Sequence, residues 1–142
     1  MSGAAEGRDW LLLLLAAGGE GTSMDPIRIM KGAFLLTQQL TANEQSAPYE
    51  FVAYHYGPCA FAVYSDLDSL VADGLAIAEH IAPSRTWPVY RVTRAGALRA
   101  RTTAQQIGEV WADYVSKLRS WLDRQSFDSL LRYVYATYPQ YA

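Results

Sequence analysis

The stretch VYSDLDSLVADGLA (residues 63–76) contains the signals that decide the fold. Val63, Leu67 and Leu70 recur at helical spacing, which predicts an amphipathic helix with its apolar side facing a core. Gly74 follows the last polar position and is the residue expected to adopt the left-handed conformation that ends many helices. We therefore expect one helix in this stretch, ended at Gly74.

A two-stranded hairpin is predicted to follow this helix. Residues 75–81 and 89–92 have the apolar, β-branched composition of strands, and residues 83–88 between them contain two prolines and are expected to form a loop. A hairpin directly after a helix has the form of a wing. Thr93 is then placed to cap a further helix.

Two apolar helices are predicted before this point. The first covers residues 9–17, with Asp9 as its N-cap. The second covers residues 26–40, with Asp25 as its cap and a proline at the first helical position, where the missing N–H costs nothing. Its solvated strip is expected to consist of Arg28, Lys31 and Gln38.

Residues 51–56 favour a short strand, which the Gly-Pro pair at 57–58 interrupts before a helix expected to start near Cys59. The order is then helix, helix, short strand, helix, strand, strand and further helices, which is typical of a winged helix-turn-helix. We expect an α+β, mostly helical fold. Its winged helix-turn-helix core is predicted over about 9–103 and a C-terminal helical extension over about 104–139.

The C-terminal extension carries an apolar seam with spacings of 4, 3, 4 and 3 residues, formed by Ile107, Trp111, Tyr114, Leu118 and Trp121. Such a seam packs inside its own chain, here against the first helix, or joins two copies, so a homodimer through the C-terminal helices stays open. Asp113 and Lys117 are expected to form an ion pair on the outer face. The last helix is predicted to start at Ser126 and repeats the spacing with Phe127, Leu130, Val134 and Tyr138.

Size and composition predict one globular domain over residues 1–142. The single cysteine, Cys59, excludes an intramolecular disulfide, which fits a reducing cytoplasm. The apolar run at 10–17 is shorter than the roughly 20 residues that span a bilayer, and acids flank it. We therefore interpret it as a buried helix of a soluble, cytoplasmic protein and expect no membrane partner.

A resemblance to a known family rests on six stretches in one order: DWLLLLL (9–15), DPIRIMKGAFLL (25–36), YEFVAYHYGP (49–58), VYSDLDSLVADGLA (63–76), YRVTRAG (90–96) and LLRYVYATYP (130–139). Together they resemble the YwgA-like family of uncharacterised bacterial winged-helix proteins over about the whole chain. Val92 stands where that family usually has leucine. The Tyr-Gly-Pro segment before a helix ending in Asp-Gly-Leu more remotely resembles the Panacea (SocA-like) antitoxin domain. The resemblance implies a winged-helix fold and brings no established activity or site residues.

Charges are unevenly distributed, although the formal net charge is only −2. Residues 1–80 hold ten acids and three bases, whereas residues 81–142 hold nine bases and four acids. Residues 81–108 contain no acid and five bases: Arg85, Arg91, Arg94, Arg99 and Arg101. Because guanidinium groups along a wing can follow a phosphate backbone, the first functional hypothesis is a DNA-associated regulator that contacts double-stranded DNA through this Arg-rich wing.

The predicted third helix argues against ordinary major-groove reading. Base edges are read mostly by Arg, Lys, Asn and Gln, and this helix has none of them. Its outer face presents Asp66, Asp68 and Asp73, which repel phosphate. Together with the aromatic seam residues Trp111 and Trp121, these acids predict the alternative function: a protein–protein interaction module, antitoxin-like or a defence-associated adaptor, without DNA binding.

No pattern of residues predicts catalysis. Cys59 is expected at a helix start, where the dipole favours a thiolate, but His55 lies across a Gly-Pro break and nothing supplies the third member of a triad. With Cys59 and His55, the soft or borderline metal ligands are His80 and the neighbouring Glu79; they are scattered, and no CxxC, HxxxH or HExxH motif occurs. We therefore expect a non-enzymatic protein with no metal site and no cofactor.

Overall fold

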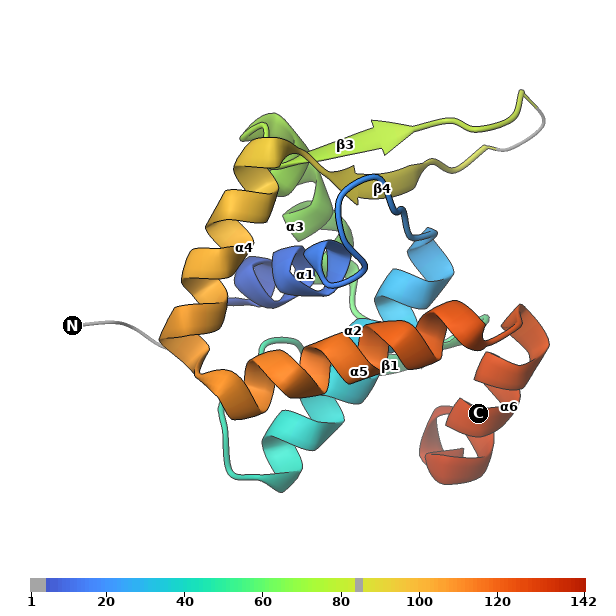
Figure 1. Cartoon of the computed structure of the whole chain (residues 1–142). Helices are drawn as coiled ribbons and strands as arrows, with labels where there is room; N and C mark the ends of the chain where they lie inside the picture. The colour runs from blue at the N-terminus through green and yellow to red at the C-terminus, as the bar shows by residue number, and fades with distance from the viewer. Residues whose placement is uncertain (1–4, 84–85) are drawn as a thin grey trace.

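The computed structural model describes residues 5–83 and 86–142 (Figure 1). This part of the chain is α+β and mostly helical, as predicted, and its two sheets are antiparallel pairs of short strands. In chain order the elements are α1 (Gly7–Ala16), α2 (Pro26–Ala42), β1 (Val52–Tyr54), β2 (Gly57–Cys59), α3 (Phe61–Ala72), β3 (Ala76–Glu79), β4 (Val89–Val92), α4 (Arg94–Ile107), α5 (Glu109–Arg124), α6 (Phe127–Thr137) and a 3-10 turn, η1 (Pro139–Tyr141).

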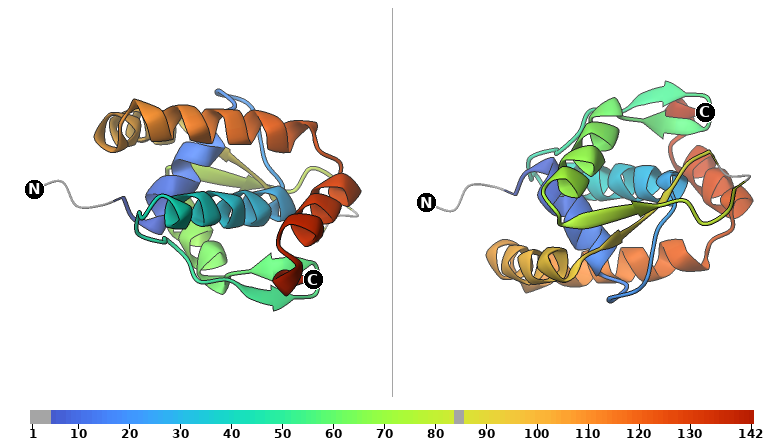
Figure 2. Two further views of the ribbon diagram at one scale, coloured as in Figure 1. Left: turned by 90° about the horizontal axis from the view of Figure 1, so that it is seen from below. Right: turned by 90° about the horizontal axis from the view of Figure 1, so that it is seen from above.

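Helix α1 lies at the centre of the molecule. It packs against α2, α3, α4 and α5. Figure 2 shows α1 and α2 in the middle, with α5 on one side and α3 with the β1–β2 hairpin on the other. The β3–β4 hairpin projects from one side of the helices (Figure 1).

The apolar run in α1 is a buried helix, as predicted. Residues 10–15 are each at most 7% exposed, because neighbouring elements surround the helix on all sides. No helix in the described residues is long and apolar enough to cross a membrane. The predicted cap is wrong by one turn: Glu6 is the N-cap, and Asp9 lies three residues inside, accepting a hydrogen bond from the Glu6 N–H at 2.9 Å.

Helix α2 starts as predicted but is more deeply buried than its polar residues suggested. The Asp25 carboxylate accepts a hydrogen bond from the Arg28 N–H at 2.9 Å, and Pro26 occupies the first helical position. Lys31, expected on the solvated strip, is only 4% exposed. That prediction is wrong because the β1–β2 hairpin covers the side chain, and its Nζ donates to the carbonyl of Pro58 at 3.4 Å.

The Gly-Pro pair does not end the strand region. It forms a second strand, β2, that folds back on β1 with Val52 opposite Cys59 and Tyr54 opposite Gly57. Gly57 has a φ of +96°, the left-handed conformation that follows the turn in many short hairpins. Helix α3 starts at Phe61, directly after the hairpin and two residues beyond Cys59, close to the predicted start.

The predicted helix end and hairpin after residue 63 are both present. Gly74 has a φ of +73°, and the Leu75 N–H then donates to the Leu70 carbonyl at 2.9 Å. Strands β3 and β4 pair with Ala76 opposite Val92. The Thr93 hydroxyl accepts from the Gly96 N–H at 3.0 Å and caps α4, as predicted.

The predicted apolar seam is interrupted. Gly108, with a φ of +91°, separates α4 from α5, so Ile107 belongs to a different helix from the other seam residues. Of the seam, Leu118 is buried, together with Val115, Arg119 and Leu122 on the buried side of α5, and the other seam residues are partly buried against the core. The ion pair expected between Asp113 and Lys117 is present at 2.9 Å.

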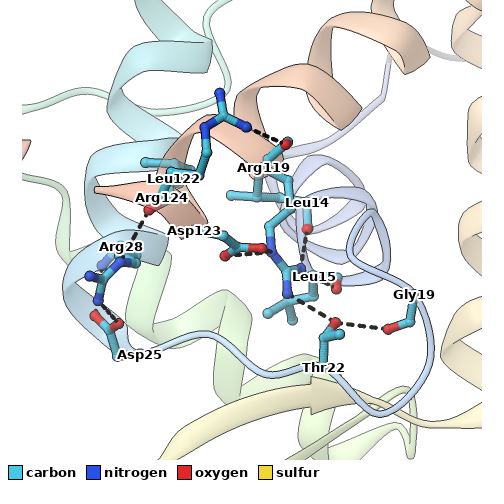
Figure 3. Close-up of polar contacts among 11 residues, drawn as sticks. Leu14, Leu15, Gly19, Thr22, Asp25, Arg28, Arg119, Leu122, Asp123 and Arg124 are labelled. Carbon is cyan, nitrogen blue, oxygen red and sulfur yellow. Dashed lines mark hydrogen bonds and ion pairs between the residues drawn. The ribbon is translucent and has the colours of Figure 1, made fainter. Parts of the chain in front are cut away.

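Arg119 is the one charged residue on that buried side, and it ties α5 to the end of α1 (Figure 3). It is 1% exposed. Its guanidinium donates to the carbonyls of Leu14 at 2.9 Å and Leu15 at 2.6 Å, and to the Thr22 hydroxyl at 3.0 Å. It also pairs with the Asp123 carboxylate at 3.0 Å. These carbonyls lie in the last turn of α1, where helical partners run out, so the cation satisfies them.

Candidate functional site

The five candidate arginines do not form one cationic strip. Arg85 lies outside the described residues. Arg91, on β4, pairs with the Glu79 carboxylate at 2.5 Å, so part of its charge is neutralised within the hairpin. The other three are exposed on α4 and have no carboxylate within 4.0 Å among the described residues: Arg94, Arg99 and Arg101.

Even the three arginines of α4 point in different directions. Arg94 and Arg101 are seven residues apart and lie on the same outer face, whereas Arg99 lies about 140° around the helix. Arg101 also lines a hollow of about 430 Å³ formed mainly by alanines of α1, α4 and α5. A single straight phosphate backbone would therefore contact two of these guanidinium groups more readily than all three.

The three candidate aspartates of α3 also differ. Asp66 accepts a hydrogen bond from the Tyr49 hydroxyl, and burial together with this bond raises the pKa of Tyr49 far above its ordinary value. Asp73 pairs with Arg8 at 2.8 Å. In the part of the chain that the structure describes, Asp68 is exposed and has no ion pair or side-chain hydrogen bond.

The two candidate tryptophans contact other parts of the same chain. Trp111 meets Trp10 edge-on, with ring centroids 6.2 Å apart. Trp121 meets Tyr133 of α6 at 5.0 Å. Both are partly buried and pack against the core, so the seam is used for intramolecular packing, the first of its two expected roles.

A different surface holds most of the exposed aromatic side chains. We define the aromatic face as Tyr54, Tyr56, Phe61, Tyr64, Trp87 and Phe127, each between 36% and 64% exposed. Ring contacts join neighbouring members: Tyr54 lies 5.3 Å from Phe61, and Phe61 lies 6.4 Å from Tyr64. Tyr56 and Phe127 are 6.1 Å apart.

A groove of about 790 Å³ runs through this face. Four segments that are distant in sequence line it: the start of α2, the β1–β2 turn with the following helix, the β3–β4 hairpin and the start of α6. Its aromatic lining consists of Tyr56, Tyr64, Trp87, Tyr90 and Phe127. Tyr90, at 9% exposed, is the most buried of these, and its backbone is held by a β-bridge to Met24.

The charged residues that line the groove neutralise each other. Arg28 donates to the Asp25 carboxylate at 2.5 Å and to the Leu122 carbonyl at 3.2 Å, and its remaining nitrogen donates to the Gln125 carbonyl. Figure 3 shows the contacts to Asp25 and Leu122. Burial, followed by the nearby charge of Asp68, raises the pKa of Tyr90, which is therefore neutral. The groove thus has neutral aromatic walls and one internally compensated ion pair.

The β1–β2 turn and α3 border the groove with a stretch of sequence that has no basic residue. Residues 32–84 contain no lysine or arginine but six acids. Lys31, immediately before them, is buried and presents no charge at the surface. The β1–β2 hairpin and α3 therefore supply only negative charge and aromatic rings to this side of the molecule.

Burial decides the chemistry expected of Cys59. The residue is the last of β2 and lies immediately before Ala60, the N-cap of α3. Burial raises the pKa of the Cys59 thiol, and the nearby Lys31 and Tyr64 lower it by a smaller amount. His55 lies on the exposed β1–β2 turn with its ring 4.5 Å from Tyr54. Among the described residues no group of three or more His, Cys, Asp or Glu is placed to hold a metal ion.

Sequence reasoning missed the aromatic face, although part of its signal is local. Tyr54, Tyr56, Phe61 and Tyr64 fall within eleven residues that contain no lysine or arginine. Phe127 was expected on the core side of α6, where Leu130 and Val134 are indeed buried. Trp87 and Phe127 join the others only through the folding of the chain.

No protein-family model matches the chain, and a comparison with curated protein sequences finds no match.

Proposed function

We propose that this chain is a winged-helix-like protein-interaction module and that the aromatic face is the surface that binds its partner. The order of α1, α2, α3, the β3–β4 hairpin and the following helices supports the winged-helix part of the proposal. The resemblance to an antitoxin domain and the acidic third helix favour this function among those expected from the sequence. The rest of the proposal depends on one surface.

The observation that carries the proposal is the exposure of connected aromatic rings around a groove. Contiguous apolar patches are uncommon on the surfaces of monomeric proteins, and large ones mark binding sites. Tyrosine, tryptophan and phenylalanine are enriched in protein interfaces, where tyrosine and tryptophan contribute a large share of the binding energy. These rings remain exposed after folding and lie on strand β1, the hairpin loops and the starts of α3 and α6, where a partner can reach them.

The charge around the face selects the chemistry of the partner. Asp68 projects from α3 without a compensating cation in the described residues, and the segment 32–84 adds no base. Complementary potentials accelerate association and disfavour wrong partners. We infer that the partner is a protein that presents a basic segment.

The test compares proteins captured by three immobilised forms of the chain from an extract of its source organism. Tyr54→Ala/Phe61→Ala removes two exposed rings of the face. The matched control, Leu98→Ala, removes a side chain that is 53% exposed on α4, away from the face. We expect at least one protein to bind the wild type and the control but not the double variant, and the purified pair to reproduce that pattern. Identical captures by all three forms would refute the assignment of the face.

A second candidate function is DNA binding through α4. Its specific observation is that Arg94, Arg99 and Arg101 are exposed and unpaired by carboxylates of the described residues. Labelled duplex DNA, titrated at about 50 mM salt and again at higher salt, tests it, since each phosphate contact adds roughly 0.9 to the slope of log affinity against log salt. Arg94→Ala/Arg101→Ala should weaken binding, whereas Arg91→Ala, which removes a cation already paired with Glu79, should change it little. Equal affinities for the two variants, or no binding at all, would exclude this route.

A further inference from the structure

We propose that the groove in the aromatic face receives the charged end of an arginine or lysine side chain from the partner. This inference rests on the proposed protein-interaction function and names the chemical group that the groove selects.

The lining provides the geometry for cation binding. Tyr56 and Tyr64 come from the β1–β2 turn and the helix that follows it, Trp87 and Tyr90 from the β3–β4 hairpin, and Phe127 from the start of α6. A cation held against several aromatic faces is attracted by their quadrupoles, and tryptophan is the strongest of these rings. Sets of rings from separate elements form the aromatic cages that recognise ammonium groups elsewhere.

The volume fits a side chain together with part of its backbone. At about 790 Å³ the groove lies within the range of roughly 300–1,000 Å³ that is usual for pockets that bind small ligands. Because it is open to solvent along the face, a peptide can lie across it and insert one side chain.

The electrostatics favour a cation over an anion. The one cation in the lining, Arg28, is engaged by the Asp25 carboxylate and by two backbone carbonyls, and it also holds α2 to the end of α5. The two helices that start at the groove carry their own compensation, because Asp25 caps α2, and Ser126 caps α6 with Asp128 in its first turn. Asp68 lies close enough to Tyr90 to raise its pKa. On the side of the groove formed by α3, the uncompensated charge of the described residues is therefore negative.

The experiment uses a matched pair of peptides in which only the charge differs. One is acetyl-Gly-Arg-Gly-Arg-Gly-amide, and the other replaces both arginines with citrulline, which has the same shape without the charge. Each is titrated into the full-length chain, labelled with ¹⁵N, while the indole resonance of Trp87 is followed. We expect the arginine peptide to shift this resonance and to bind roughly fivefold or more tightly than the citrulline peptide.

Two variants locate the effect. Tyr64→Leu removes a ring of the groove and keeps an apolar side chain, so it should abolish most of the preference for arginine. Tyr133→Leu makes the same change at an exposed tyrosine of α6 outside the groove lining and should leave the preference intact. The dispersion of the remaining amide resonances shows that each variant is folded.

Three results would overturn the inference: equal binding of the two peptides, shifts that avoid Trp87, or no shift at millimolar peptide. Equal binding at Trp87 would leave the protein-interaction function standing, because the groove would then be an apolar site. A clear arginine preference together with identical captures in the extract experiment would instead retain the cation site and remove the proposed partner surface. The two failures are thus distinguishable.

Discussion

Replacing Arg119 with methionine is expected to lower the free energy of unfolding by about 3–5 kcal/mol. The methionine keeps most of the apolar volume of the side chain and removes its guanidinium group. In the wild type this group is 1% exposed, and all three of its nitrogens donate hydrogen bonds to neighbouring groups.

The expected loss of stability follows from the hydrogen-bond acceptors that Arg119→Met leaves without a donor. Without the guanidinium the carbonyls of Leu14 and Leu15, at the end of α1, lose a charged donor in a buried place (Figure 3). Each unsatisfied buried acceptor costs about 1–3 kcal/mol, and the Thr22 hydroxyl loses a further partner. Asp123 contributes little to this sum, because its side chain is 44% exposed and returns to water.

Two companion variants separate the hydrogen bonds from the ion pair. Asp123→Asn removes the carboxylate alone and should cost at most about 1 kcal/mol. Arg119→Lys keeps the charge but loses the planar fork that reaches both carbonyls, so its cost should be intermediate. It also provides a measurable variant if the methionine form does not fold.

The assay is equilibrium unfolding in urea, followed by tryptophan fluorescence and by circular dichroism. A shift of the midpoint without a change in slope reports a true loss of stability. A loss below about 1 kcal/mol for Arg119→Met, or an equal loss for Asp123→Asn, would refute the reasoning that backbone carbonyls of α1 are the main partners.

Three further substitutions and one chemical reaction test other parts of the structure. Lys31→Met should stabilise the protein by about 1–3 kcal/mol near pH 7. Burial lowers the pKa of Lys31 below 10.5, so between the folded-state pKa and 10.5 the unfolded chain binds more protons than the folded chain. The wild type therefore gains stability as pH rises through this range, and the advantage of the variant, measured by urea unfolding, should shrink. Gly96→Ala should destabilise by about 3 kcal/mol in the same assay, because a Cβ would lie 1.9 Å from the Leu75 carbonyl oxygen. Gly74→Ala should cost about 1–2 kcal/mol, because space is open there and only the positive φ is unfavourable. A larger loss for Gly74→Ala than for Gly96→Ala would contradict this explanation. Because burial raises its pKa, the Cys59 thiol of the folded protein should react with iodoacetamide at pH 8 at least roughly tenfold more slowly than that of the protein unfolded in urea. Mass spectrometry follows the reaction, and equal rates in the two states would mean that the thiol is accessible.

Local signals predicted most elements of the fold because each depends on residues close in sequence. The Asp25 cap, the turn at Gly74 and the Thr93 cap are hydrogen-bonding or conformational features of three or four consecutive residues. Strands β3 and β4 were also recognised, since their composition and the intervening prolines are local. The helix end and the hairpin after residue 63 were therefore placed correctly.

The errors occur where a distant segment determines the environment. Lys31 has the spacing of a solvated residue, but the β1–β2 hairpin closes over it. For Arg119 the sequence made no prediction; it lies on the buried side of α5 because the end of α1 offers carbonyls to its guanidinium. Strand β2 was missed because a three-residue strand containing Gly and Pro is stable only when paired with β1.

By itself the sequence determined the helical periods, the helix end at Gly74, the hairpin after α3 and the absence of bases between Lys31 and Arg85. These properties follow from residue type and spacing, so they need no knowledge of the fold. Only the tertiary structure decided which aromatic rings stay in water and which charges are neutralised. The aromatic face and its groove combine side chains of α3, α6 and both hairpins, and no local pattern encodes a distance between residues that are tens of positions apart.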